Sequence, residues 1–460
     1  MSDTVVQTNR VEFKAIAGIG LATLYVALFL LYVAVRIINL QAVQEPRVFP
    51  DTRVYTNIAT QSYRDLSFWV GGRPWTVPLV YKLLRKDFPS IARVQLGLSI
   101  VCWMLLAVAV ARAVKSPGLK PLALGIVLLF SLSTEVILWD AVVLSDSISI
   151  SLMALLIAGG LWLLEGWNGF KVAALAAVAF GWAFARDTNA WILLMIAGTL
   201  FIAAAARLIQ ARYLVLAGAF AVIFFMNDLS ANYAKRWHIA FMNVVGMRIL
   251  PSPERTAYFA ERGMPVTPVL LERRDKKAWD DGWAFTKDPA LQSFRDWMYV
   301  RGKSTYIRFL LSHPAFTIQE PLRHLEQLLS SEMRRYGPND FSPILEGALA
   351  EVIYPKQWAL FWIWATAATV GLALGLRVWT LNPAFVVALA LIIVTYPHAA
   401  LQWHGDPNEI GRHGLQAAIH LRLGIWLLLI FAADALILRS GNTGRYQGAE
   451  LPVNAGSSTA

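Results

Sequence analysis

The feature that most constrains this chain is a series of about ten apolar stretches, each long enough to cross a hydrocarbon core of about 30 Å as a helix. A helix satisfies its own backbone hydrogen bonds, which a bilayer cannot do. Hydrophobic residues make up 57% of the chain and the mean hydropathy is +0.50, which is too apolar for a soluble protein. The stretches lie near residues 14–38, 92–113, 119–138, 147–164, 170–186, 190–209, 213–229, 357–376, 381–400 and 418–438. We therefore expect an all-α polytopic membrane protein.

The basic residues of the short loops predict its orientation. An even number of spans puts both termini on one side, and short cytoplasmic loops are enriched in Lys and Arg. The short loops on the side of the termini carry Arg112, Lys115, Lys120, Lys171, Arg207, Arg212 and Arg377. Those on the other side carry Arg186 and Arg412. This pattern predicts cytoplasmic termini in the inner membrane of a bacterium, with 14–38 kept as a first span.

The orientation divides the chain into four parts. Residues 1–229 form an N-terminal transmembrane module with an outward loop, 39–91, in which an interfacial helix follows Pro74. Residues 230–356 form a small extracytoplasmic helical region, 357–438 the C-terminal transmembrane helices, and 439–460 a disordered cytoplasmic tail. The net charge of +11 is spread beside the spans, so we expect membrane lipids as partners and no nucleic acid.

Ionisable groups at or near membrane depth are costly, so each is a candidate site. Asp51 follows Pro50 shortly after the first span, where a carboxylate can act as a base on an acceptor hydroxyl. The same residues are also typical of a helix start, and the sequence alone favours neither interpretation.

Two further clusters lie at short outward turns. Asp140 and Asp146 could bind a divalent cation or orient a sugar, while Ser145 is predicted to cap the next helix. Arg186 breaks the charge pattern and therefore requires an anion, which is either its neighbour Asp187 or a lipid phosphate.

The richest cluster precedes the last span. It contains His404, Asp406, Glu409, Arg412 and His413. Their spacing matches no common zinc pattern. In a helix, Glu409 would share a face with Arg412 or His413, and a guanidinium there can bind phosphate through paired hydrogen bonds.

This order of features resembles the GT-C superfamily of integral-membrane glycosyltransferases. The matching elements are Asp51, Leu144-Ser145-Asp146-Ser147, Glu409-x-x-Arg412-His413 and Tyr306-Ile307-Arg308-Phe309-Leu310-Leu311-Ser312-His313-Pro314. The resemblance implies that a polyprenyl-phosphate sugar donates its sugar to an extracytoplasmic acceptor, which is a glycan, a lipid or a protein. It also implies that Asp51 is the catalytic base. The chain lacks the Asp-x-Asp or Glu-x-Asp pair of metal-binding members, so no cofactor is assigned and a divalent metal is not favoured.

The mechanism expected from this resemblance is direct displacement with inversion at the anomeric carbon. Arg186, Arg412 and His413 would bind the donor phosphate and stabilise its departure. Substrate contacts are assigned to Asp140, Asp146, His404, Asp406, Glu409, Tyr55 and Arg73.

Two other functions fit the same layout. An O-antigen ligase or polymerase would place its essential groups in residues 230–356, at His313, Arg323 and His324. A lipid or solute transporter would require broken helices at matching positions of two halves, and the sequence shows no such pair.

Overall fold

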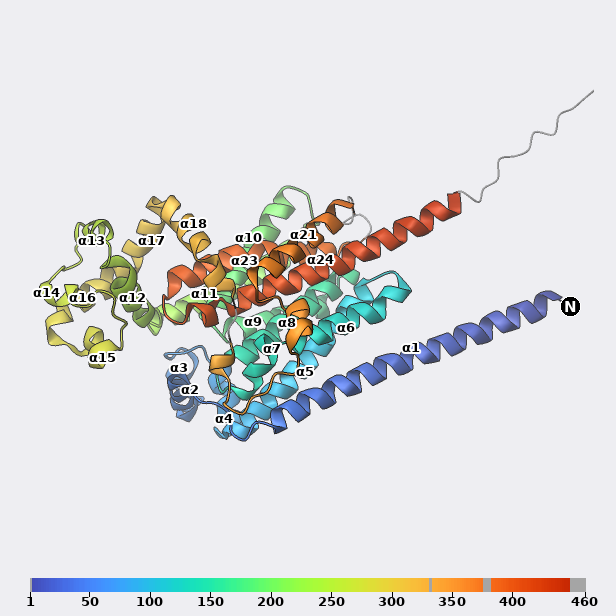
Figure 1. Ribbon diagram of the computed structural model, residues 1–460. Coiled ribbons are helices and arrows are strands. Elements are labelled where there is room, and N and C mark those ends of the chain that lie inside the picture. Colours follow the sequence, from blue (N-terminus) through green and yellow to red (C-terminus); the bar gives the residue numbers. More distant parts are fainter. Residues whose placement is uncertain (1, 331–332, 375–381, 447–460) are drawn as a thin grey trace, which may run out of the picture.

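Helices account for nearly all the regular structure of the protein, as the computed structural model in Figure 1 shows. The structure describes residues 2–330, 333–374 and 382–446. Within these ranges the β-structure is a single isolated bridge between Arg47 and Val142.

In the described part, seven helices are long and apolar enough to cross a membrane. They are α1 (Ser2–Gln41), α5 (Phe88–Ala113), α8 (Asp146–Glu165), α10 (Asp187–Ala205), α11 (Tyr213–Tyr233), α23 (Phe385–Gly405) and α24 (Ile410–Tyr446). Two bent pairs raise the number to nine if each pair is one span. They are η1 (Pro117–Leu119) and α6 (Lys120–Ser131) with α7 (Thr134–Ile137) and η2 (Leu138–Ala141), and α20 (Gly347–Ile353) with α21 (Trp358–Leu374).

The remaining predicted stretch, 170–186, forms α9 (Gly169–Ala183), a shorter apolar helix of 15 residues. Each of the ten predicted stretches therefore coincides with a helix where the structure describes it, and the prediction of an all-α multi-pass membrane protein is confirmed. Arg377, which contributed to the orientation, lies outside the described residues.

The two bent pairs are joined by an ion pair whose carboxylate is buried. The first pair turns by 58° and the second by 49°. Glu135, next to the first bend, is 1% exposed and lies 3.0 Å from Lys356, which follows α20 at the second bend. A carboxylate in this position requires a cationic partner, so the pair joins the two bends.

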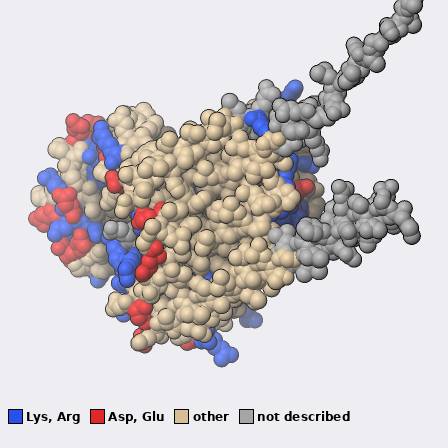
Figure 2. Space-filling view, turned by 45° about the vertical axis from the view of Figure 1, so that its right-hand side comes forward, with Lys and Arg blue, Asp and Glu red and all other residues tan. Residues whose placement is uncertain are grey.

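The start of α1 and the end of α24 lie at one end of the bundle, and most of the shorter helices outside the candidate spans lie at the other (Figure 1). The second group includes α2 (Pro50–Thr60), α3 (Leu66–Trp69) and α4 (Thr76–Leu83) from the loop 39–91. It also includes α12 (His238–Val244), η3 (Val245–Ile249), α13 (Pro253–Ala260), α14 (Pro268–Leu271), α15 (Asp280–Lys287), η4 (Pro289–Leu291), α16 (Gln292–Trp297), η5 (Met298–Gly302), α17 (Lys303–Ser312), α18 (Pro314–Arg323), α19 (Leu325–Leu329) and η6 (Arg334–Tyr336). On the face shown in Figure 2, charged residues gather at this end and a broad uncharged band crosses the bundle.

Much of the region 230–356 packs around a hydrophobic core of its own. Aromatic side chains dominate this core, among them Phe241, Phe259, Phe285, Phe294 and Trp297, and all are buried. A separate core is what a small domain needs in order to hold its shape beside the membrane helices.

Two expected local features differ in the structure. The helix after Pro74 exists as α4, but its buried face is not the predicted one of Trp75, Leu79, Val80 and Leu83. Its most buried side chains are Val77 and Tyr81, and Leu83 is exposed. The predicted tail 439–460 is helical through residue 446, because α24 continues that far. Residues 447–460 lie outside the described ranges.

Candidate functional site

Asp146 is the centre of a charged cluster at the end of the bundle where most of the shorter helices lie. It is the first residue of α8, and its side chain is fully buried. Arg186 donates to its Oδ1 at 2.8 Å, and Arg412 donates to its Oδ2 at 3.0 Å. A carboxylate at a helix N-terminus is also favoured by the helix dipole. Asp146 thus ties α8 to the starts of α10 and α24.

Arg412 connects this buried carboxylate to the open part of the cluster. Its Nη1 donates to Glu409 at 2.7 Å and lies 4.0 Å from Oδ2 of Asp51. The guanidinium also lies 6.0 Å from the centre of the Trp139 ring. Three carboxylates from separate elements therefore surround one arginine.

Asp51 lies in the first turn of α2, but its side chain does not cap the helix. The N-cap residue is Phe49, and Pro50 begins the helix. Arg73 donates to Oδ1 of Asp51 at 2.6 Å, and the Asp51 side chain is 36% exposed. A helix therefore starts here as expected, but Asp51 is not its cap. The role of Asp51 as a base stays a prediction.

The helix that carries Asp51 is fixed to the rest of the bundle. The hydroxyl of Thr52 donates to the carbonyl of Val143 at 2.7 Å and accepts from the backbone of Phe49. Tyr55 is buried, lies 5.8 Å from the Arg73 guanidinium, and packs edge-on against Tyr81. These contacts position Asp51 relative to the turn that leads into α8.

Arg186 and the next residue, Asp187, pair with different residues and not with each other. Asp187 pairs with Arg236 at 2.8 Å, while Arg186 pairs with Asp146. Arg186 is the N-cap of α10 and has an extended backbone, so its side chain leaves the first helical turn. The proposed local pair between Arg186 and Asp187 is therefore absent among the hydrogen bonds and ion pairs of the described residues.

Two arginines of the cluster retain donors for a ligand. A guanidinium has five N–H donors. Within the described residues Arg186 uses one of them, on Asp146, and Arg73 uses one, on Asp51. The Arg186 side chain is 13% exposed and that of Arg73 is 38% exposed. His413 interacts electrostatically with both. The cluster can therefore accept an oxyanion without losing its internal ion pairs.

Three of the predicted substrate contacts lie elsewhere. Asp140 is buried and bonds to Arg36 and Ser147 instead. His404 contacts the carbonyl of Thr317 at 3.0 Å. Asp406 accepts from Asn243 at 3.0 Å, and burial raises its pKa to about 6. The structure brings Asp51, Arg73, Tyr55, Asp146, Arg186, Glu409, Arg412 and His413 together and separates Asp140, His404 and Asp406 from them.

Asp140 and Asp146 do not share a site for a divalent cation. Each carboxylate is already neutralised by its own arginine partners, Arg36 for Asp140 and the pair Arg186 and Arg412 for Asp146. In the part of the chain that is described, no three His, Cys, Asp or Glu side chains are grouped as metal ligands. Ser145 occupies the N-cap position of α8, but its side chain makes no capping hydrogen bond.

Sequence reasoning missed Arg36 and Arg236. Arg36 lies inside an apolar span, which is by itself a signal that a buried anion must accompany it. Arg236 follows α11 and bonds both carboxylate oxygens of Asp187 and the carbonyl of Gly71, at 3.2 Å. Nothing in the sequence pattern pointed to this pairing.

The residues expected for a ligase or polymerase do not form a cluster of their own. His313 contacts Ser312 and the carbonyl of Phe309. Arg323 and His324 do share a partner, because they lie 2.9 and 3.8 Å from Glu320, and His324 also stacks on Trp403 with ring centres 4.2 Å apart. His313 is not part of this contact.

The fold defines this chain as a multi-pass α-helical membrane protein. No protein-family model matches it, and no curated protein is similar to it at a significant level.

Proposed function

We propose that this protein is a membrane glycosyltransferase that moves a sugar from a polyprenyl-phosphate-linked donor to an extracytoplasmic acceptor. The observation that carries the proposal is the half-exposed Asp51 carboxylate beside Arg73 and Arg412, with Arg186 on the far side of Asp146. In this proposal the protein lies in the inner membrane of a bacterium. The cluster then faces outward, at the level of the lipid headgroups.

The two oxygens of Asp51 would have separate tasks. Arg73 donates to Oδ1, and this hydrogen bond orients the carboxylate. Oδ2 accepts no hydrogen bond from the described residues and lies 4.0 Å from Arg412. Oδ2 is therefore the atom that would take the proton of the acceptor hydroxyl.

The transfer itself is a single displacement. The acceptor oxygen forms a bond to the anomeric carbon while the bond from that carbon to the lipid phosphate oxygen breaks, and the configuration inverts. The proton of the acceptor passes to Asp51, and the electron pair leaves with the phosphate. Because phosphate is a good leaving group, it needs hydrogen-bond donors for its charge more than it needs a proton.

The arginines differ in what they can give to that phosphate. Arg412 already bonds to Asp146 and Glu409, so we assign it to positioning. Arg186 and Arg73 keep most of their donors and are better placed to bind the leaving group. The ring of Tyr55 lies 5.8 Å from the Arg73 guanidinium and helps to position it.

The test is the replacement Asp51→Asn in purified protein reconstituted in nanodiscs. Loss of a general base slows transfer by about 10²–10⁴-fold, so we expect that reduction with the protein still folded and still binding donor. The assay measures transfer of radiolabelled sugar from polyprenyl-phosphate donors to acceptors in membranes prepared from cells that lack the protein. A parallel reaction with a chelator decides whether a divalent cation takes part.

Glu45→Gln is the matched control, because Glu45 is an exposed carboxylate in the same loop. It should transfer sugar at the rate of the unmodified protein. Equal transfer by Asp51→Asn would exclude Asp51 as the base. Absence of transfer by the unmodified protein across a panel of such donors would reject the proposed function itself.

A further inference from the structure

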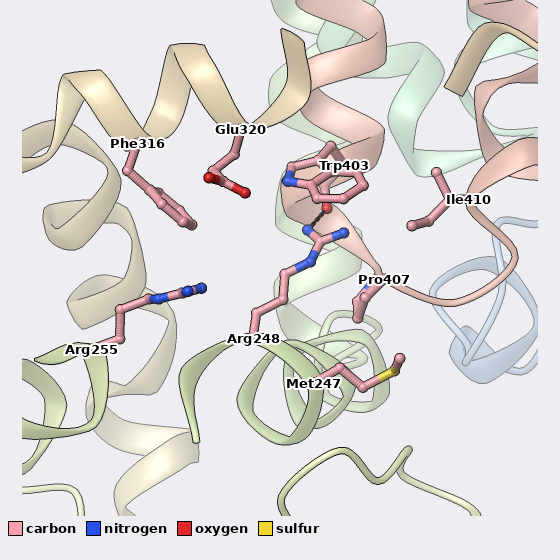
Figure 3. Close-up of a pocket in the computed structure, with 8 residues that line it drawn as sticks. All are labelled: Met247, Arg248, Arg255, Phe316, Glu320, Trp403, Pro407 and Ile410. Carbon is pink, nitrogen blue, oxygen red and sulfur yellow. Dashed lines mark hydrogen bonds between the residues drawn. The ribbon is translucent and has the colours of Figure 1, made fainter. Parts of the chain in front are cut away.

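A second charged pocket lies between α18 and the connection from α23 to α24. It encloses about 280 Å³ and includes Arg248, Arg255, Glu320 and Trp403 in its lining. Figure 3 shows both guanidinium groups and the Glu320 carboxylate directed toward the same space. Asp51 and the other residues of the proposed active site do not line it.

Arg248 is fixed in this pocket with part of its hydrogen-bonding capacity unused. The residue is 9% exposed, its Nη1 donates to the carbonyl of Trp403, and its guanidinium lies 3.9 Å from the centre of the Trp403 ring. Its Nη2 is buried and has no hydrogen-bond partner among the residues that the structure describes. Burial lowers the pKa of Arg248 to about 10, so the group stays charged at neutral pH. A buried unpaired donor on a charged group is unfavourable until an acceptor reaches it.

Arg255 extends the positive surface on the opposite side of the pocket. Its guanidinium lies 5.1 Å from the centre of the Phe316 ring and makes no hydrogen bond within the described residues. Glu320 shares its charge with Arg323, at 2.9 Å, and lies 3.8 Å from His324. The pocket therefore carries an excess of positive charge, which suits a ligand with several oxygen acceptors.

The position of the pocket indicates where such a ligand comes from. Trp403 lies near the end of α23 and Ile410 begins α24, and both helices qualify as membrane spans. Tyr396, inside the first of these spans, donates to the carbonyl of Ile318 in α18 at 2.7 Å. Ile318 and its helix neighbour Leu322 are 51% and 47% exposed. A helix tied to a span and exposing apolar side chains is expected at the membrane interface.

We propose that Arg248 and Arg255 bind the phosphate of a membrane lipid headgroup at this second site. The inference goes beyond the proposed function and does not depend on it, because it concerns binding at residues outside the Asp51 cluster. A soluble phosphate compound has the same chemistry, and the experiment below separates the two sources.

The experiment is isothermal titration of the full chain in phosphatidylcholine nanodiscs. The probes are dihexanoyl phosphatidic acid, dihexanoyl phosphatidylcholine with the same tails, and inorganic phosphate. We expect saturable binding of the phosphatidic acid and weaker binding of the phosphatidylcholine. Arg255→Gln should weaken the first by about tenfold or more, since a charge-assisted hydrogen bond is lost.

Arg262→Gln is the matched control, because Arg262 also lies over an aromatic ring, Tyr258, but is exposed and does not line the pocket. It should bind all probes as the unmodified protein does. Arg248→Gln should act like Arg255→Gln, and Arg255 keeps the test decisive if that buried variant fails to fold. Saturable binding of inorganic phosphate alone, still sensitive to Arg255, would support the phosphate site and identify a soluble ligand. No saturable binding of any phosphate probe, or equal losses in Arg255→Gln and Arg262→Gln, would overturn the proposal.

Discussion

Replacing Asp146 with asparagine should strongly destabilise the fold, because two arginines depend on this buried carboxylate. The Asp146 side chain is 0% exposed, and those of Arg186 and Arg412 are 13% and 6% exposed. Removal of one partner from a buried ion pair costs about 3–5 kcal/mol, since the other charge stays desolvated. Arg412 keeps Glu409 at 2.7 Å, whereas Arg186 loses its carboxylate partner within the described residues. We therefore expect a loss of about 3–5 kcal/mol for the whole substitution.

The other end of the same helix supplies the control. Glu165 ends α8 and pairs with Arg112 through two hydrogen bonds, of 2.8 and 3.1 Å, but the Arg112 side chain is 63% exposed. Exposed pairs contribute roughly 0–1 kcal/mol because water screens both charges. Glu165→Gln is the same chemical change as Asp146→Asn, so it isolates the effect of burial.

Unfolding by SDS in mixed micelles, followed by tryptophan fluorescence, measures both free energies under one set of conditions. The double variant Asp146→Asn with Arg186→Gln removes a charge together with its partner, so we expect it to be destabilised by less than the sum of the two single changes. Equal stability losses at Asp146 and Glu165, below about 1 kcal/mol, would refute the assignment of Asp146 as a buried charge that holds α8 to α24.

Two further predictions concern packing and pH. Gly414→Ala should destabilise the protein by about 1–3 kcal/mol or more, because a Cβ there would lie 2.1 Å from the carbonyl oxygen of Leu328. Gly371→Ala should be tolerated, since the nearest atom to its Cβ would be 3.8 Å away. Unfolding in SDS compares the stability of the two variants. Burial raises the pKa of Asp406 from 3.8 to about 6, so its contribution to stability is full below pH 3.8 and is lost as the pH rises through 6. Asp406→Asn should remove this pH dependence and be more stable than the unmodified protein at pH 7, by roughly 1–3 kcal/mol, and unchanged pH profiles between pH 4.5 and 7 would contradict it.

Membrane spans were predictable because one local property, the length of an apolar run, determines them. The same property does not show where a span bends. The stretch 119–138 was predicted as one span, yet it breaks between Ser131 and Thr134, where Ser131, Ser133, Thr134 and Glu135 interrupt the apolar run. Glu135 at this break pairs with Lys356. That pair joins residues far apart in the sequence, and no local pattern contains it.

Helix boundaries in the region 230–356 were also only partly predictable from the sequence. The sequence predicts helices over 304–311 and 320–336, with a break at Pro314, and Pro314 does follow the end of α17. It is also the first residue of α18, a position that suits proline because its missing N–H would have no helical partner there. The expected helix 320–336 is instead divided between α18 and α19 at His324. Pro314 marks a boundary, whereas Pro321 lies inside α18. Tertiary packing therefore decides which prolines end a helix.

The partners of the candidate site illustrate what a sequence can and cannot show about charge. An arginine on an apolar edge must have an anion nearby, and that requirement led correctly to Arg186 as a residue that needs one. Which anion it meets depends on how α8, α10 and α24 pack, and Asp146 is separated from Arg412 by 266 positions in the chain. Asp140 and Asp146 looked equivalent in sequence, but η2 turns the first toward Arg36 in α1 while α8 starts with the second facing Arg186. Asp140 and Asp146, six residues apart, therefore belong to two separate ion-pair networks. Of these two, the network of Asp146 is the one that reaches Asp51, a partly exposed carboxylate beside arginines with unused N–H donors.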